Sequence, residues 1–215
     1  MDLTLQGSLL DLTDEMSLRD LGAARRHGLA HGAWVDVRPD WLAAGDELFS
    51  ALLHEVPWHA ERRQMYDSVV DVPRLTKFYA AGERLPHPML VAARDALSAH
   101  YADELGEPFV TAGLCLYRDG RDSVAWHGDR IGRSRDSDTM IAILSLGSPR
   151  TLALRPRDGG AIPGTTHKAL RFPLAHGDLV VMGGSCQRTW DHAIPKTSDA
   201  VGPRISVQFR VSGVR

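Results

Sequence analysis

A histidine and an aspartate stand two residues apart in the middle of this 215-residue chain, in the stretch DSVAWHGDRIG. The stretch has the character of a strand end, and residues i and i+2 of a strand point to the same face. His127 and Asp129 therefore offer an imidazole and a carboxylate to a single metal ion. A polar turn at the surface would have the same composition, so the pair alone leaves both interpretations open.

A metal site of this kind needs a third ligand from another part of the chain. His192 supplies it in the stretch TWDHAIPK, which follows the strand-like run DLVVMGG. His176 competes for this place, but it precedes a strand and suits a turn. Two histidines and one carboxylate on one face of an octahedron leave positions open, as in non-haem Fe(II) oxygenases.

The last β-rich run, RISVQFR, alternates polar with apolar residues. In a strand its polar side chains share one face, namely those of Arg204, Ser206, Gln208 and Arg210. One interpretation is an edge strand with a hydrated face. The other is a pocket wall that binds an anionic co-substrate, because arginine recognises a carboxylate through two parallel hydrogen bonds. Together with the His-x-Asp pair and the later histidine, the pattern favours the pocket.

The order of these residues, ending in two arginines with five residues between them, resembles the AlkB family of Fe(II)- and 2-oxoglutarate-dependent dioxygenases. The stretches LYRDGRDSVAWHGD, HGDLVVMGG and WDHAIPK are similar to the core of that family, and PRLTKFY is similar to the segment before it. The resemblance covers roughly residues 60–212. Many oxygenases share the His-x-Asp and later His pattern, whereas the arginine spacing is characteristic of this group.

The resemblance implies a role for each metal-site residue. His127, Asp129 and His192 would bind Fe(II) and be catalytic. The family uses the iron, O2 and 2-oxoglutarate to hydroxylate an N-methyl group on a flipped nucleobase, and the methyl group leaves as formaldehyde. The cofactor, the co-substrate and the reaction are thus expectations from this resemblance.

The resemblance also assigns the co-substrate residues. Arg204 would bind the distal carboxylate of 2-oxoglutarate with help from the hydroxyl of Tyr117. Arg210 would lie near the metal-bound end and count among the catalytic residues. Cys115 and Ser206 would line the same pocket, although relatives often carry asparagine at both positions. Both side chains suit a pocket wall, so we still expect 2-oxoglutarate to bind.

The stretch ERRQMYDSVVDVPRLTKFY lies where the family builds its substrate lid. A base taken out of a stack needs an aromatic or apolar wall and cations for its phosphates. The candidates for the wall are Met65, Tyr66, Phe78 and Tyr79, and those for the cations are Arg62, Arg63, Arg74 and Lys77. The alternative is that half of the aromatic residues pack in the core.

A second group of cations follows the His-x-Asp pair in RIGRSR. Arg130 stands there directly after Asp129, where related repair enzymes carry acidic residues, and Arg133 and Arg135 follow it. These arginines could bind phosphates beside the site, but charged loops are usually just solvated. The substitution weakens the assignment of the substrate more than that of the chemistry.

The pattern of secondary structure expected along the chain changes near residue 107. The second half holds short β-rich runs separated by turn residues, at the spacing of an antiparallel sandwich or barrel: FVTAGLCLY, TMIAILSLG, RTLALRPR, ALRFPL, DLVVMG and RISVQFRV. The first half has two helical patterns, one in WLAAGDELFSALLHEV with Asp40 as its cap and one beginning at Pro88. Between them we expect short strands and loops.

The sequence therefore predicts a single, mainly β (α+β) domain over residues 1–215. Residues 107–215 would form a double-stranded β-helix (jelly-roll) catalytic core. Residues 1–106 would carry the N-terminal helices, packed on one sheet, and the substrate lid.

The composition limits the choice of partner and compartment. A net charge of −2 argues against a wholesale polyanion binder but allows a local basic patch. Two cysteines without a Cys-x-x-Cys motif fit a reducing compartment and exclude a thiolate zinc site. The acidic N-terminus shows no secretory signal, and no apolar run approaches the roughly 20 residues of a membrane helix. We expect a cytoplasmic protein with no membrane association and no evident obligate protein partner.

These observations predict an enzyme that demethylates N-alkylated bases in DNA or RNA. We expect single strands to be preferred, because no intercalating finger is obvious in the sequence. The alternatives are a related oxygenase acting on tRNA, protein or a small molecule, and a nucleic-acid or ligand-binding module without turnover. The intact metal triad and both arginines argue against the last.

Overall fold

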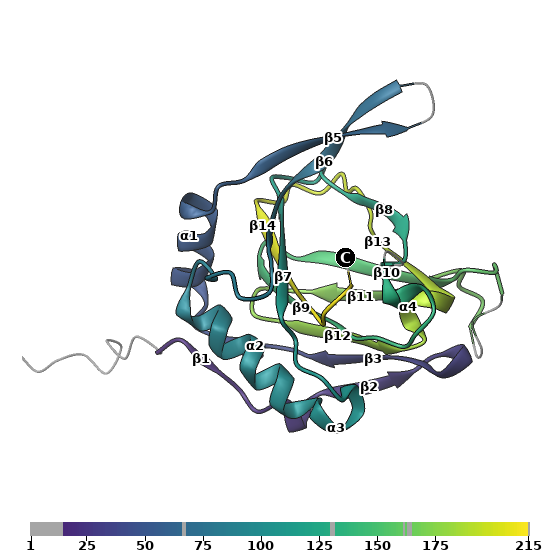
Figure 1. Ribbon diagram of the computed structural model, residues 1–215. Helices are drawn as coiled ribbons and strands as arrows, with labels where there is room; N and C mark the ends of the chain where they lie inside the picture. The colour runs from purple at the N-terminus through teal and green to yellow at the C-terminus, as the bar shows by residue number, and fades with distance from the viewer. Residues whose placement is uncertain (1–14, 66–67, 130–131, 161, 163–164, 215) are drawn as a thin grey trace, which may run out of the picture.

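The computed structural model describes residues 15–65, 68–129, 132–160, 162 and 165–214, and it gives no side-chain detail for residues 62–71. Two antiparallel sheets dominate the molecule, and Figure 1 shows the smaller one facing part of the larger one. The larger sheet has the strand order β2-β3-β12-β9-β14-β7-β6-β5, and the smaller has the order β11-β10-β13-β8. The structure is therefore mainly β, as the sequence predicts.

The larger sheet draws its strands from the whole chain. They are β2 (Arg25–Gly28), β3 (Ala33–Arg38), β5 (His59–Met65), β6 (Ser68–Tyr79), β7 (Thr111–Tyr117), β9 (Ile141–Gly147), β12 (Leu179–Gly184) and β14 (Arg204–Arg210). The smaller sheet consists of β8 (Val124–His127), β10 (Arg150–Pro156), β11 (Leu170–Leu174) and β13 (Trp190–Ile194). The six β-rich runs named from the sequence are all strands, and the pairings within both sheets are antiparallel.

The N-terminal region is less helical than the sequence indicates. Strands β2 and β3 lie before the first helix and extend the larger sheet next to β12. The sequence of β2, RRHG, has no alternation of apolar and polar residues, whereas AWVDVR of β3 carries a short one, with Val35 and Val37 alternating with Asp36 and Arg38. Strand β2 is therefore a strand because it pairs with β3, which in turn pairs with β12.

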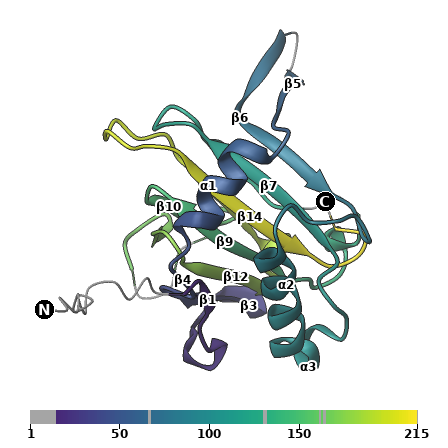
Figure 2. The same ribbon diagram turned by 90° about the vertical axis from the view of Figure 1, so that its left-hand side faces the viewer.

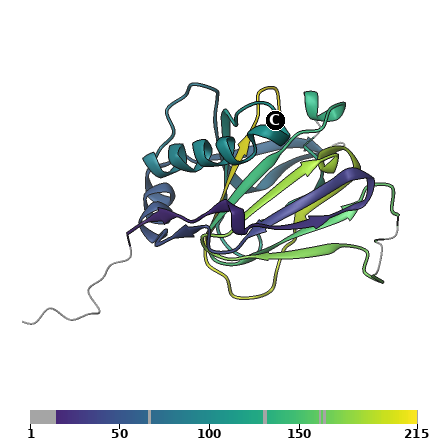
Figure 3. The same ribbon diagram turned by 90° about the horizontal axis from the view of Figure 1, so that it is seen from below.

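Two longer helices and two short ones complete the fold. They are α1 (Asp46–Glu55), α2 (Pro88–His100), α3 (Ala102–Leu105) and α4 (Cys186–Thr189), with single 3-10 turns at Leu21–Ala23, Ala30–Gly32 and Arg133–Arg135. Figures 2 and 3 show α1 and α2 on the outer face of the larger sheet. This arrangement confirms the expected packing of helices on one sheet. None of the helices in the described part of the chain is long and apolar enough to span a membrane.

The first helix begins later than predicted, and Asp40 is not its cap. Asp40 has a φ of 52°, and its backbone N–H donates to the carboxylate of Asp178 at 2.8 Å. Trp41 is completely buried, and the next two residues form the short strand β4 (Leu42–Ala43), which pairs with β1 (Ser17–Leu18). The apolar residues at the start of the predicted helix therefore anchor a turn in the core.

The second helix matches its prediction. Pro88 occupies its first turn, and the ring nitrogen Nδ1 of His87 accepts a hydrogen bond from the backbone N–H of Met89 at 3.1 Å. A proline suits this position because the first N–H groups of a helix have no partner within it.

The expected short strands between the helices are two longer ones. Strands β5 and β6 form a ribbon that projects beyond the rest of the sheet in Figures 1 and 2. Strand β6 pairs with β7 only from Leu75 to Tyr79, and its outer part pairs with β5 alone. The outer hairpin is thus held to the body of the protein through the inner half of β6.

Strand β14 lies in the centre of the larger sheet, between β9 and β7. Its apolar residues Ile205, Val207 and Phe209 have no exposed surface. The interpretation of RISVQFR as an edge strand with a hydrated face is therefore wrong. The polar face of β14 looks into the space between the two sheets, and this space contains the site.

Candidate active site

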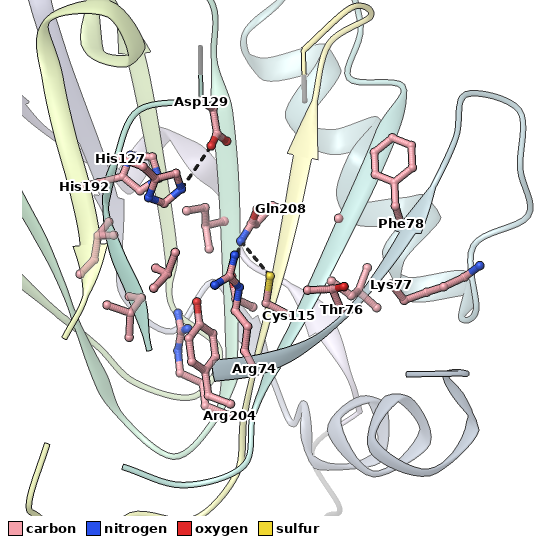
Figure 4. A pocket seen from close by; sticks show the side chains of 18 of the residues that line it. Arg74, Thr76, Lys77, Phe78, Cys115, His127, Asp129, His192, Arg204 and Gln208 are labelled. Carbon is pink, nitrogen blue, oxygen red and sulfur yellow. Dashed lines mark hydrogen bonds and ion pairs between the residues drawn. The ribbon is translucent and has the colours of Figure 1, made fainter. Parts of the chain in front are cut away.

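The smaller sheet brings the three predicted metal ligands together. His127 ends β8, and it lies opposite His192 of β13 in the strand register. The two imidazole centroids are 4.2 Å apart, and Asp129 follows two residues after His127. One ligand atom from each of the three residues lies within 4.8 Å of the others (Figure 4).

The surrounding hydrogen bonds fix the orientation of these ligands. The Nδ1 atom of His127 lies 2.8 Å from the carbonyl oxygen of Ala125, which leaves Nε2 facing Asp129 at 3.4 Å from Oδ1. A ring N–H that donates to a carbonyl sets the tautomer and frees the other nitrogen for a metal. The backbone N–H of Asp129 donates to Oε1 of Gln187, and the backbone carbonyl oxygen of Asp129 accepts a hydrogen bond from the hydroxyl of Ser134.

Arg210 reaches from the larger sheet to the carboxylate of Asp129. Its Nε and Nη2 atoms lie 3.1 and 2.8 Å from Oδ2, and both side chains are almost completely buried. Burial alone would raise the pKa of Asp129, but Arg210 and the hydrogen bond from His127 hold it well below its usual range. Burial and the nearby His127 lower the pKa of His192 to about 3. At neutral pH the site thus offers an ionised carboxylate and a neutral imidazole, the forms that bind metals.

Two further residues set the position of Arg210: Gln208, which the sequence places on the same polar strand face, and Gly113, which was not singled out from the sequence. Gly113 lies opposite Gln208 in the register, and a Cβ atom at Gly113 would be 2.8 Å from Nη1 of Arg210. Gln208 accepts a hydrogen bond from Nη2 of Arg210. The glycine within the apolar run FVTAGLCLY was the available signal, because an isolated glycine in a strand often marks a close approach. Gln187, in contrast, has no recognisable signal.

A cavity of about 920 Å³ opens between the two sheets beside the triad. Arg204 lies in its wall and is 1% exposed. Its Nε donates to the hydroxyl of Ser145 at 3.0 Å, and its Cζ lies 5.2 Å from the centre of the Tyr117 ring. Its Nη1 atom is buried and has no hydrogen-bond partner among the described residues.

An unpaired buried guanidinium costs free energy unless an anion binds to it. The pocket around Arg204 provides the matching hydrogen-bonding groups. Burial raises the pKa of Tyr117 to about 12, so its phenol stays neutral at neutral pH and can donate to a carboxylate. The donor set of the triad fits a first-row metal, and the unpaired Nη1 of Arg204 fits a carboxylate. The residues therefore suit both groups expected from the sequence.

The strand register places the other proposed co-substrate residues in the same cavity. Arg204 lies opposite Tyr117 and Ser206 lies opposite Cys115, because β14 pairs with β7. These four side chains line the cavity together with Arg210. The sequence thus correctly grouped them, although they come from two segments about 90 residues apart.

The proposed substrate residues divide into three groups. Arg74 and Phe78 line the cavity, and the guanidinium of Arg74 points inward (Figure 4). Tyr79 is 6% exposed and packs in the hydrophobic core, so the structure does not support it as a stacking wall. Tyr66 and Arg130 lie outside the described residues, as does the side chain of Met65.

Other cations near the site have local partners. Arg133 forms an ion pair with Glu107, and Lys77 forms one with Glu83 at 3.7 Å. Arg74 differs, because its Nε is buried without a hydrogen-bond partner in the described part of the chain. Its Nη1 makes a long contact of 3.4 Å with the carbonyl oxygen of Ser123, and its guanidinium also interacts with the thiol of Cys115.

Comparisons with known proteins agree with this site. The family model described as the 2OG-Fe(II) oxygenase superfamily matches residues 43–210. The alpha-ketoglutarate-dependent dioxygenase alkB homolog 3 of Homo sapiens is 30% identical over 211 residues, covering 91% of this chain and 69% of that protein. The Bos taurus alkB homolog 3 is 32% identical over 79% of this chain, and the match spans 62% of that protein, just under two thirds. The DNA oxidative demethylase ALKBH2 of Homo sapiens is 27% identical, with 78% and 69% coverage.

Solved structures share the fold at low identity. A 2OG-Fe(II) oxygenase family oxidoreductase from Burkholderia pseudomallei has a TM-score of 0.56 at 12% identity, covering 82% of this chain and 84% of its own. The structure of OsALKBH1 has a TM-score of 0.56 at 13% identity, with 82% and 97% coverage. These similarities support the expected double-stranded β-helix.

This chain belongs to the 2OG-Fe(II) oxygenase superfamily and, within it, to the AlkB homologues. It is a dioxygenase that uses Fe(II) and 2-oxoglutarate. The prediction of an enzyme is therefore confirmed, and the alternative of a binding module without turnover is not supported. The iron, when bound, supplies the redox chemistry that couples O2 to decarboxylation of the co-substrate.

The protein's own residues bind and orient the reactants. His127, Asp129 and His192 would hold the iron, and Arg210 keeps the carboxylate of Asp129 ionised and in place. Arg204 and Tyr117 would bind the far carboxylate of the co-substrate. Apolar side chains in the cavity wall help to exclude water from the reacting groups, among them Val124, Leu152, Leu174 and Ile194.

Asp129→Ala should abolish turnover and weaken Fe(II) binding. The change removes the only anionic ligand of the triad and leaves Arg210 buried without its carboxylate. Metal affinity can be measured by competition with a chelator, and turnover by succinate formation. The matched control is Asp119→Ala, whose carboxylate pairs with Arg121 at the surface. Full metal affinity in Asp129→Ala would rule out Asp129 as a ligand.

Arg204→Ala should weaken 2-oxoglutarate binding by roughly 10- to 100-fold, since a hydrogen bond to a charged group contributes about 1.5–3 kcal/mol. Iron binding should stay nearly intact, because Arg204 does not contact the triad. Calorimetric titration of 2-oxoglutarate without O2 measures the first effect, and chelator competition measures the second. Arg121→Ala, at an arginine that is 89% exposed, is the control. A collapse of iron binding in Arg204→Ala would instead identify Arg204 as structural.

Proposed function

We propose that this dioxygenase oxidatively demethylates N-alkylated nucleobases in DNA or RNA, with a preference for single strands. The observation that carries the proposal is the 30% identity to human alkB homolog 3 over 91% of the chain. A second relative bears the name DNA oxidative demethylase. The matched region spans 62–69% of the alkB homolog 3 relatives quoted above, so the substrate is an inference for this chain.

The shape of the cavity supports a substrate larger than the co-substrate alone. Its volume of about 920 Å³ lies at the upper end of the range for small-molecule sites, roughly 300–1,000 Å³. One wall comes from the β5–β6 ribbon, which contributes His59, Glu61, Arg74, Thr76, Lys77 and Phe78. A base could enter between this ribbon and the triad, with its N-methyl group toward the metal.

Phe78 is the aromatic side chain of this wall that is best placed to stack on a base. It is 40% exposed, which is unusual for a large apolar residue, and it lies at the edge of the cavity (Figure 4). Stacking on an aromatic ring contributes about 1–3 kcal/mol per base and is tolerant of sequence. The exposure of Phe78 therefore supports a nucleobase as the substrate.

The proposed preference for single strands rests on energetics. Taking a base out of a duplex costs a few kcal/mol, and a single strand avoids most of this cost. A chain with a net charge of −2 neutralises few phosphates, so it gains little electrostatic free energy to offset the cost. Binding should be modest and weaken as salt is added.

A screen of methylated oligonucleotides tests the proposal directly. Methylated DNA and RNA, single- and double-stranded, are incubated with the enzyme, Fe(II), ascorbate and 2-oxoglutarate and then analysed by mass spectrometry. We expect loss of the methyl group with matching succinate formation, faster for single strands. If the enzyme converts 2-oxoglutarate but demethylates no oligonucleotide, the substrate is a protein or a small molecule.

Phe78→Ala should lower the affinity for single-stranded oligonucleotides by roughly 5- to 100-fold, as expected for a lost stacking contact. Fluorescence anisotropy with a labelled oligonucleotide measures this change at low salt. Val91→Ala is the matched control, because Val91 is 37% exposed on α2, away from the cavity. Equal affinities for the Phe78→Ala variant and the unmodified enzyme would remove Phe78 from the substrate site.

A further inference from the structure

A free thiol lies in the co-substrate cavity, and the chemistry described above gives it no role. Cys115 of β7 lines the cavity and is 8% exposed. Its neighbours across the sheet are small, Thr76 on β6 and Ser206 on β14. The cavity-lining residue two positions before it is Gly113. The sulfur borders the cavity, and the side chains of Gln208 and Arg74 lie beside it (Figure 4).

The same region of the cavity is built to bind carboxylates. The guanidinium of Arg204 has a buried Nη1 without a hydrogen-bond partner among the described residues. The Nε of Arg74 is also buried and also lacks such a partner there. Arg204 lies opposite Tyr117, and Cys115 is two residues from Tyr117 on the same strand. Two residues of a strand span about 7 Å, so a diacid whose carboxylate is bound by the guanidinium has its central carbons within reach of the thiol.

We propose that Cys115 is a covalent modification site for unsaturated dicarboxylates, of which fumarate is the simplest. Arg204 binds one carboxylate, and this places the carbon–carbon double bond beside Sγ of Cys115. Holding the two reactants together in one cavity raises their effective concentration well above that in solution. A slow solution reaction thereby becomes selective for this thiol.

The reaction is an addition and needs no oxidant and no leaving group. A bond forms between Sγ and one alkene carbon, the π bond breaks, and the thiol proton ends on the other alkene carbon. The amide Nε2 of Gln208 lies 3.6 Å from Sγ and donates a hydrogen bond to it. This hydrogen bond stabilises the negative charge on the sulfur when the thiol has lost its proton. The product keeps both carboxylates in the cavity, so 2-oxoglutarate is excluded and the enzyme is inactivated.

The second cysteine of the chain provides an internal control. Cys186 lies on α4 and is 2% exposed. It does not line the co-substrate cavity, and burial raises the pKa of its thiol to about 12. Fumarate should leave Cys186 unmodified. The inference rests on the dicarboxylate cavity and is independent of the nucleic-acid substrate.

Peptide mass spectrometry after incubation with fumarate tests the proposal. We expect one fumarate adduct on the Cys115 peptide and none on the Cys186 peptide, with 2-oxoglutarate suppressing the adduct. Acrylamide, a neutral electrophile, serves as the reference for access to the thiol. Succinate formation should stay lost after free fumarate is removed, in proportion to the adduct, whereas the Cys115→Ser variant should carry no adduct.

The role of the guanidinium is tested with Arg204→Gln and Arg204→Lys. Arg204→Gln should lower the fumarate rate at Cys115 at least tenfold relative to the acrylamide rate, and Arg204→Lys should lower it less because the cation remains. Arg121→Gln, at the surface, is the matched control. Three results would each overturn the proposal: acrylamide labels Cys115 but fumarate does not, 2-oxoglutarate gives no protection, or neither reagent reacts with Cys115.

Discussion

The ion pair between Arg210 and Asp129 joins the two halves of the site. Asp129 belongs to the loop after β8 of the smaller sheet, and Arg210 ends β14 in the centre of the larger one. This contact crosses the space between the sheets, so it fixes the distance between the metal ligands and the strand that binds the co-substrate. It also keeps a buried carboxylate ionised, which a metal ligand requires. Gly113 and Gln208 matter because they leave Arg210 the room and the partner for this one geometry.

The opposite end of the cavity contains Arg204, whose guanidinium lacks one hydrogen-bond partner among the described residues. Arg204 is buried with one unpaired nitrogen, and its hydrogen bond to Ser145 and its contact with the Tyr117 ring offset only part of the cost of burying its charge. The unpaired nitrogen raises the free energy of the empty site. A carboxylate that binds to Arg204 removes this penalty, which contributes to the affinity for the co-substrate. The thiol of Cys115 shares this pocket, so the same positive potential that selects 2-oxoglutarate draws other dicarboxylates to a nucleophile.

Sequence reasoning succeeded where local periodicity and residue chemistry coincide. The alternation of RISVQFR, the His-x-Asp pair and the histidine after DLVVMGG each placed a side chain on the correct face. It failed where tertiary contacts override local signals: β2 is a strand because it pairs with β3 although RRHG has no alternation, and α1 starts late because Trp41 packs in the core. The sequence suggested Tyr79 as a stacking residue, but its side chain packs in the hydrophobic core. The side chain of Phe78, the residue before it, is exposed. Gly113 left only the signal of an isolated glycine in a strand, and Gln187 left none, because its contact with Asp129 forms only in the folded chain.

One cavity holds the metal triad at one end and a guanidinium with an unpaired nitrogen at the other. The most direct test is a crystal structure of the enzyme with Fe(II) and 2-oxoglutarate, prepared without O2. We expect a single ion bound by His127, Asp129 and His192, with the far carboxylate of 2-oxoglutarate on Nη1 of Arg204. An ion that misses any of the three ligands, or a co-substrate carboxylate bound away from Arg204, would contradict it.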